Sequence, residues 1–269
     1  MSELNYSFIG AGKMATAIAA GMVRSGIAPA RIHAYDVAKA AADSFQNTTG
    51  AVIAESMTEA IAASDVVILA VKPQYAPQAL AEARPALEGK LLISIAAGLT
   101  IKYLQTASGI SRIIRVMPNT PALAGAGMSC YAGAAGISGT DLETAKEILG
   151  SIGKARMVSE SQLDAVTGLS GSGPAFVMEF IMGMADGGVY SGLPRDLALE
   201  MALQTVLGTA KMCQESQVSI GELRDAVISP AGTTAEGILV MQQAGFKGTA
   251  AKAVIAAAKR SAELGKGKE

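Results

Sequence analysis

Residues 8–15 read Phe8-Ile9-Gly10-Ala11-Gly12-Lys13-Met14-Ala15, with the spacing G-x-G-x-x-A. They follow a short apolar run and open a segment of helical spacing, as a dinucleotide-binding loop does. The first glycine allows a tight turn, the second lets a pyrophosphate approach the backbone, and the small alanine lets helix and strand pack closely. The helix start offers free amides to phosphate oxygens. An ordinary tight turn is the alternative, but the context favours dinucleotide binding through Gly10, Ala11, Gly12, Lys13 and Met14.

Short β-rich runs alternate with helical segments in the first part of the chain. Strands are expected at residues 6–9, 32–35, 66–70, 91–95 and 113–117, and helices at 14–24 and 58–63. This alternation indicates βαβ units and a parallel sheet. The apolar runs do not alternate with polar residues, as expected for strands covered on both faces. Two S/T-x-x-E patterns, starting at Ser56 and at Thr140, predict helix starts.

Strand signals fade after about residue 160, and the remainder reads as helices separated by glycine and proline. Helices are expected at 175–190, from Pro194 to about 212, and at 249–264. Their apolar surface, for example at Phe176 and Met182, is hard to bury in a small domain and favours an intersubunit interface. The predicted fold is therefore α/β, with a Rossmann domain at residues 1–160 and an all-helical dimerisation domain at 161–269.

Composition excludes several classes of protein. The chain has 269 residues, is half apolar, and has a net charge of −1 without a basic run, so no nucleic-acid partner is expected. The longest strictly apolar run, 66–71, is too short to cross a bilayer, and no signal peptide fits before the first strand. Cys130 and Cys213 lack C-x-x-C spacing and suggest small buried residues in a cytoplasmic protein. The single histidine, His33, lies in a predicted strand, and no metal site is expected.

Asp36 ends the second predicted strand, 21 residues after Ala15. An acidic residue there accepts a hydrogen bond from the ribose 2′-hydroxyl and repels a 2′-phosphate. Two like charges ~4 Å apart cost about 1 kcal/mol in water. The alternative is a loop or cap aspartate whose charge Lys39 offsets. The cofactor is expected to be NADPH or NADH, with a slight preference for NADH.

Five further stretches resemble motifs of the pyrroline-5-carboxylate reductase family, in its usual order. They read Ala-Val-Lys-Pro at 70–73, Ser-Ile-Ala-Ala-Gly at 94–98, Arg-Val-Met-Pro-Asn-Thr-Pro at 115–121, Gly-Leu-Ser-Gly-Ser-Gly-Pro-Ala-Phe at 168–176 and Ser-Pro-Ala-Gly-Thr-Thr at 229–234. The resemblance spans essentially the whole chain. It implies hydride transfer from NAD(P)H to the C=N carbon of 1-pyrroline-5-carboxylate, giving L-proline in the final step of proline biosynthesis. It also implies a helical domain that interlocks with a second subunit.

The resemblance implies site residues as well. The cofactor contacts are expected at Val71, Lys72, Pro73, Ala96, Ala97 and Gly98. The substrate contacts are expected at Glu160, Val227, Ser229, Gly232, Thr233 and Thr234. The last two begin a predicted helix whose amides suit a carboxylate, and Thr233 is expected to cap it as well. In the family Thr234 is suggested as a proton donor, although a threonine hydroxyl is a poor acid, and substrate positioning is the other interpretation.

The chain departs from the family pattern at two positions, and two other functions are alternatives to the one that the resemblance implies. Ala231 stands where members commonly have glycine, which is tolerable unless the position needs a positive φ. Met57 stands where many members have asparagine, so one adenosine-side contact is in doubt. A β-hydroxyacid dehydrogenase would share the architecture, but its expected lysine is Val177 here. A nucleotide sensor without turnover is the non-enzymatic alternative.

Overall fold

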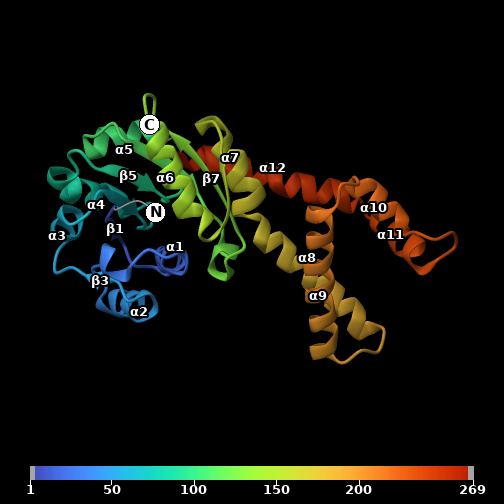
Figure 1. The fold of residues 1–269 in the computed structure, drawn as a ribbon. Coiled ribbons are helices and arrows are strands. Elements are labelled where there is room, and N and C mark those ends of the chain that lie inside the picture. The colour runs from blue at the N-terminus through green and yellow to red at the C-terminus, as the bar shows by residue number, and fades with distance from the viewer. Residues whose placement is uncertain (1–3, 266–269) are drawn as a thin grey trace. The chain divides into compact units, whose positions relative to one another are not determined.

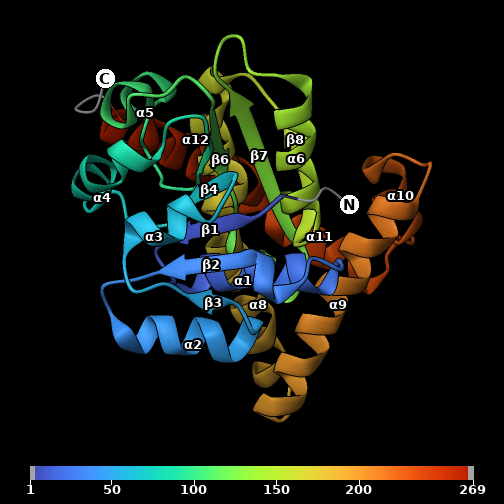
Figure 2. The ribbon, with the colours of Figure 1, turned by 60° about the vertical axis from the view of Figure 1, so that its left-hand side comes forward.

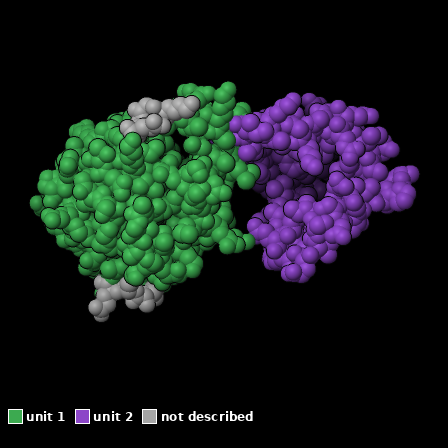
Figure 3. Space-filling model, turned by 90° about the horizontal axis from the view of Figure 1, so that it is seen from above, with its two compact units in different colours: residues 1–171, 256–269 green, residues 172–255 purple. Residues whose placement is uncertain are grey.

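The computed structural model describes residues 4–265 of the chain. It forms two compact units, residues 1–171 with 256–269 and residues 172–255, which are coloured separately in Figure 3.

Unit 1 is built on a sheet of eight strands (Figures 1 and 2). The strands are β1 (Tyr6–Ile9), β2 (Ile32–Tyr35), β3 (Val52–Ile53), β4 (Val66–Leu69), β5 (Leu91–Ser94), β6 (Ile113–Met117), β7 (Gly127–Gly133) and β8 (Gly153–Met157). Their order is β3-β2-β1-β4-β5-β6-β7-β8, and neighbours are parallel except for the antiparallel pair β6–β7. All five predicted strands are confirmed, two of them one residue shorter than expected. The sequence reading did not include β3, β7 or β8.

Helices cover both faces of this sheet. They are α1 (Lys13–Arg24), α2 (Lys39–Thr49), α3 (Met57–Ala62), α4 (Ala76–Ala83), α5 (Ile101–Ser108), α6 (Gly139–Gly150) and α7 (Leu163–Val166). One apolar cluster joins the sheet to α1, α2 and α6, and a second joins it to α3, α4, α5 and α7. Every residue of β1, β4 and β5 is buried, which explains why these strands are mainly apolar and do not alternate with charged residues. Burying a side chain such as Phe8 contributes about 1.5–3 kcal/mol.

The two predicted helix starts have different outcomes. Ser56 caps α3 by accepting a hydrogen bond from the amide of Glu59, as expected. The predicted cap at Thr140 is wrong, because α6 already begins at Gly139 and its cap is Ser138, which accepts from the amide of Asp141 at 3.0 Å. A serine followed three residues later by an aspartate satisfies the first turn equally well.

Unit 2 is helical. It contains α8 (Gly173–Tyr190), α9 (Arg195–Glu215), α10 (Ile220–Ala226) and α11 (Thr233–Gln243), and α12 (Phe246–Gly265) contributes to both units. The predicted helices are confirmed with ends shifted by up to three residues. The buried cluster of unit 2 is small, with Ala185, Ala198 and Ala202 as its fully buried members, whereas large apolar side chains such as Met178 and Leu207 are exposed. No helix in the described part of the chain is long and apolar enough to cross a membrane.

Candidate active site

The glycine loop lies between the carboxyl ends of β1, β2 and β4. Gly10 has φ +96°, its amide donates to the carbonyl of Tyr35 at 2.9 Å, and a Cβ there would lie 2.9 Å from the carbonyl oxygen of Ala70. Only glycine fits this position. Gly12 is the cap residue of α1, and a Cβ on it would meet nothing within 4 Å. The first turn of α1 has neither a side-chain cap nor an acidic residue, so its amides are available to an anion.

A cavity of about 400 Å³ adjoins this loop. Of the expected cofactor residues, it is lined by Gly10, Gly12, Asp36, Val71 and Lys72. Ala11 is buried beneath the loop, Lys13 is exposed, Met14 is half-buried, and Pro73 follows Lys72 without lining the cavity. Met57 forms part of the cavity wall, so the chain has an apolar side chain at the position where many family members have an asparagine. The cavity is at the carboxyl ends of parallel strands, where ligands of such sheets bind.

Asp36 braces the glycine loop. Its Oδ2 accepts from the amide of Ala11 at 2.7 Å, and its Oδ1 accepts from the amide of Ala38 at 2.8 Å. Two backbone donors therefore offset its charge. A carboxylate has about four acceptor positions, so two remain for other donors. The aspartate is both a loop constraint and a wall of the cavity, a double role that the sequence motif alone does not reveal.

A second loop, residues 95–100, leaves the end of β5 and carries Ala96, Ala97 and Gly98. Ala96 is buried, Ala97 is exposed, and Gly98 is half-buried with φ +72°. The loop ends at Thr100, which caps α5 by accepting from the amide of Tyr103 at 3.1 Å. Like the glycine loop, it lies at a carboxyl strand end, so the sheet itself brings the two loops to one edge.

The side chain of Glu160 is hydrogen-bonded at the end of this second loop. Its Oε1 accepts from the amide of Ile101, the first residue of α5, at 2.7 Å and from Nη1 of Arg115 at 3.1 Å. Arg115 lies in β6 beside Ser94, the last residue of β5. Sequence reasoning named Glu160 but missed Arg115, because no local pattern marks a contact between residues 45 positions apart.

Asn119 connects two of the family-like motifs. Its Oδ1 accepts from the amide of Met128 at 2.8 Å, and its Nδ2 donates to the carbonyl of Ser170 at 3.0 Å. Ser170 belongs to a π-helix, Thr167–Gly171, a form that is often found at functional sites. A Cβ on Gly171 would lie 2.5 Å from Cε of Met117, so the two motifs pack closely. In the sequence, the position of Asn119 between two prolines is the signal that could have indicated its role in joining the two motifs.

The expected substrate residues of unit 2 share one turn between α10 and α11. Val227 is 60% exposed, and the carbonyl of Ser229 accepts from the amide of Gly232 at 3.0 Å. Gly232, not Thr233, is the cap residue of α11, and it provides no side-chain cap. The prediction that Thr233 caps the helix is therefore wrong; Thr233 and Thr234 form the first turn, which leaves amides unpaired by a capping side chain.

Ala231 adopts a left-handed conformation in this turn, with φ 55°. Among the described residues it is the only non-glycine with a positive φ. The position is thus one that favours glycine, and the alanine costs about 1 kcal/mol of conformational strain. Alanine in place of the family's glycine was expected to be tolerable unless position 231 needs a positive φ, and the position does need one.

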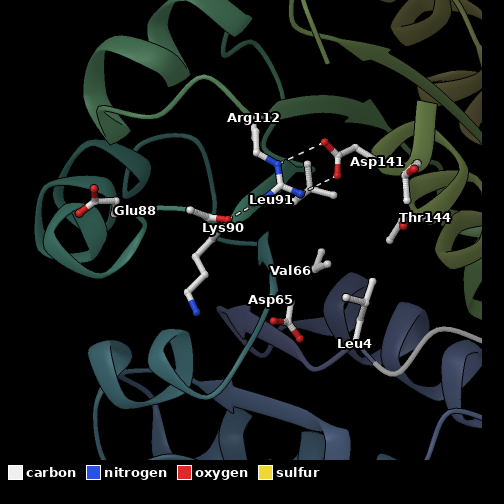
Figure 4. Close-up of a pocket in the computed structure, with 11 residues that line it drawn as sticks. Leu4, Asp65, Val66, Glu88, Lys90, Leu91, Arg112, Asp141 and Thr144 are labelled. Carbon is white, nitrogen blue, oxygen red and sulfur yellow. Dashed lines mark hydrogen bonds and ion pairs between the residues drawn. The ribbon is translucent and has the colours of Figure 1, made fainter. Parts of the chain in front are cut away.

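A second cavity, of about 310 Å³, lies at the opposite, amino-terminal edge of β4 and β5 (Figure 4). Arg112 pairs there with Asp141 at 2.7 Å and donates to the carbonyl of Gly89 at 2.6 Å. The hydrogen bond from Arg112 holds the pKa of the Asp141 carboxyl below its usual range, and the same bond raises the pKa of Arg112. Because these charges satisfy one another, the geometry indicates a structural tie between α6 and the residue that precedes β6.

The fold, the glycine loop and its cavity define a Rossmann-type oxidoreductase that binds a nicotinamide dinucleotide. Two family models match: pyrroline-5-carboxylate reductase dimerisation at residues 160–264, and NADP oxidoreductase coenzyme F420-dependent at residues 5–98. The chain belongs to the pyrroline-5-carboxylate reductase family.

Relatives and a solved structure support this membership over nearly the full length. A pyrroline-5-carboxylate reductase of Glycine max is 46% identical over 263 residues, covering 96% of this chain and 94% of the relative. One of Methanosarcina acetivorans is 43% identical over 270 residues, covering 99% and 100%. A crystal structure of Plasmodium falciparum pyrroline carboxylate reductase with NADP bound is 35% identical, has a TM-score of 0.89, and covers 98% of this chain and 99% of that one.

Proposed function

We propose that this chain reduces 1-pyrroline-5-carboxylate to L-proline, the last step of proline biosynthesis. NAD(P)H gives a hydride to the imine carbon, the ring nitrogen gains a proton, and NAD(P)⁺ and L-proline leave. The observation that carries the proposal is the near-complete similarity to pyrroline-5-carboxylate reductases, combined with an intact turn at residues 229–234.

The cofactor lies along the carboxyl edge of the sheet. The pyrophosphate is held at the start of α1 by Gly10, Ala11, Gly12, Lys13 and Met14, supported by the uncapped first turn. The adenosine half occupies the cavity beside Asp36, Val71, Lys72 and Pro73. The nicotinamide half extends toward Ala96, Ala97 and Gly98, where the positive φ of the glycine keeps the backbone close and free of a side chain.

Asp36 sets a modest preference for NADH. Its carboxylate lines the cavity and keeps acceptor capacity for ribose hydroxyls, whereas a 2′-phosphate would bring a second negative charge beside it. The two amides that donate to Asp36 reduce this repulsion, which makes the preference modest. The Plasmodium falciparum relative has NADP bound in its crystal structure, which supports use of the phosphorylated cofactor as well.

The substrate carboxylate binds at the start of α11. The amides of Thr233 and Thr234, which directly follow Gly232, have no capping side chain, and the helix dipole favours an anion there. Ser229 offers a hydroxyl, and the exposed Val227 offers apolar surface to the ring. Thr234 positions the ring nitrogen and passes it a proton, which solvent water replaces on the hydroxyl. Because a threonine hydroxyl is a poor acid, most of its effect comes from orientation.

The protein works as a homo-oligomer through its C-terminal helices. Exposed apolar side chains of α8 and α9 support this, as does the match to a dimerisation model. We place the boundary between the dinucleotide-binding domain and the helical domain after residue 160, because the match to the dimerisation family begins there. The cysteines Cys130 and Cys213 are both free, which suits the cytoplasm.

The direct test is the fate of a deuteride. Cofactor reduced with deuterium at the transferable position is incubated with 1-pyrroline-5-carboxylate, and the product is analysed by mass spectrometry and NMR. Proline carrying deuterium on the former imine carbon is the expected product. Cofactor binding without labelled proline would favour the nucleotide-sensor alternative.

A further inference from the structure

Glu160 makes contacts that tie the nicotinamide-side loop to the sheet. A single oxygen, Oε1, accepts both from the amide of Ile101 at 2.7 Å and from Arg115 at 3.1 Å. We propose that Glu160 and Arg115 are a positioning pair that holds loop 95–100 in the geometry required for the cofactor. This inference rests on the proposed function, and it assigns Glu160 to the cofactor side in place of direct substrate contact.

The backbone that carries Glu160 is itself fixed. Ser159 and Gln162 form a capping box around it, with the amide of Ser159 donating to Oε1 of Gln162 at 2.9 Å. Just before this turn, the amide of Val158 donates to the carbonyl of Tyr131 at 2.9 Å. The glutamate therefore projects from a turn that is anchored to β7, which makes its side chain a stable support.

Arg115 explains why a charged acceptor is needed. Its side chain is only 10% exposed, while that of Glu160 is 35% exposed. A buried guanidinium requires a counter-charge, and among the described residues Glu160 is the carboxylate that pairs with it. The arginine also stands beside the last residue of β5 in the sheet register, where loop 95–100 departs.

The loop is consequently held at both ends. At its start the amide of Ala96 donates to Oγ of Ser94 at 3.4 Å, and at its end Glu160 and Thr100 accept from the amides of Ile101 and Tyr103 in the first turn of α5. Releasing the Glu160 contact frees the end that follows Gly98. Hydride transfer is sensitive to displacements of this kind, because the reacting atoms must be aligned closely.

The two roles for Glu160 predict different kinetics. A positioning residue on the cofactor side affects binding of the reduced dinucleotide and the hydride step, whereas a substrate contact affects the KM for the imine. Glu160→Gln keeps an oxygen for the Ile101 amide but loses the charge that pairs with Arg115, and Glu160→Ala loses both. The expected order of effect is therefore Ala greater than Gln.

The experiment measures cofactor dissociation constants by reduced-nicotinamide fluorescence, together with kcat and the KM for 1-pyrroline-5-carboxylate. The control is Glu147→Gln, an exposed glutamate of α6 with the same change of charge. Glu160→Ala is expected to raise the cofactor Kd about tenfold and Glu160→Gln about threefold, with the KM for the imine within about twofold. A larger primary deuterium isotope effect on kcat is expected in both variants, because alignment for the hydride step is lost.

Three results would overturn the inference: a raised KM for the imine with an unchanged cofactor Kd, equal effects of Glu160→Gln and Glu147→Gln, or a Glu160→Ala protein indistinguishable from wild type. If Glu160→Ala does not fold, as judged by circular dichroism, the comparison of Glu160→Gln with its control decides. If the wild-type protein fails to reduce the imine, the proposed function fails, but the cofactor titrations still test the positioning pair.

Discussion

The carboxylate of Asp36 accepts a hydrogen bond from the backbone amide of Ala11 at 2.7 Å. The carboxylate proposed to face the cofactor ribose thus also supports the glycine loop, and its second oxygen accepts from the amide of Ala38. Under this proposal, the choice of cofactor and the conformation of the glycine loop depend on the same side chain. Substitutions at Asp36 are expected to change both properties together.

Replacing Asp36 with serine should raise the ratio of kcat/KM for NADPH to that for NADH by about tenfold, because removing the carboxylate removes a repulsion of about 1 kcal/mol or more. The KM for NADH should also rise, since the loop loses a brace. Steady-state kinetics with both cofactors measures the ratio. Asp36→Asn is the matched control, because it keeps one acceptor oxygen without the charge. An unchanged ratio in both variants would show that the aspartate does not face the ribose.

Thr234→Ala should lower kcat by about ten- to a hundredfold with little change in cofactor affinity, because the proposed partner of its hydroxyl is the imine and not the dinucleotide. Thr234→Ser keeps the hydroxyl and should retain most activity. Fluorescence titration and turnover at saturating substrate separate the two effects. Loss of cofactor affinity with normal turnover at saturation would contradict the placement of this turn at the substrate.

Ala231→Gly should stabilise the protein by about 0.5 kcal/mol. It removes a left-handed alanine that costs about 1 kcal/mol, but glycine also raises the conformational entropy of the unfolded chain, which offsets part of this gain. Chemical denaturation at fixed protein concentration measures the difference. Ala256→Gly in the exposed face of α12 is the control, and it should destabilise by about 0.5–1 kcal/mol. Equal destabilisation by the two changes would rule out strain at Ala231.

Ser129→Ala should be neutral or stabilising by about 1 kcal/mol, because the Ser129 hydroxyl is buried without a hydrogen-bond partner among the described residues. Ser7 is an equally buried strand serine, but its hydroxyl bonds to that of Ser64 at 2.8 Å. Ser7→Ala should therefore destabilise by about 1 kcal/mol. Thermal unfolding compares the pair, and a similar loss in both would indicate a hidden partner for Ser129.

The pair of Arg112 and Asp141 predicts a stability loss in acid. The hydrogen bond from Arg112 lowers the pKa of Asp141 in the folded state below its ordinary value of 3.8. The unfolded state then binds a proton first as pH falls, so the stability from this pair is complete above that value and is lost as pH falls through the folded pKa. Melting temperatures of wild type and Asp141→Asn should converge in this acidic range. Parallel curves down to the lowest pH would contradict the pairing.

The sequence predicted the Rossmann core well, because a fully buried strand such as β4 leaves an unbroken apolar run. It missed β7 and β8, whose residues Gly127–Gly133 and Gly153–Met157 include small or charged side chains and depend on neighbouring strands for their structure. The glycine loop was recognisable from its spacing together with its context, a strand before it and a helix after it.

The site was less predictable where contacts join distant residues. The bond from Ile101 to Glu160 spans 59 positions, and that from Asn119 to Ser170 spans 51, so neither leaves a local pattern. The cap of α11 was misassigned because a threonine in an S/T-x-x-E pattern does not reveal whether the preceding glycine already takes the cap position.

The most direct test is the loss of reduced-nicotinamide absorbance when 1-pyrroline-5-carboxylate is added, measured in parallel with NADH and NADPH. Turnover is expected with both cofactors, with a modestly higher kcat/KM for NADH. Absence of turnover with either cofactor, in protein shown to be folded and to bind the dinucleotide, would contradict the proposed function.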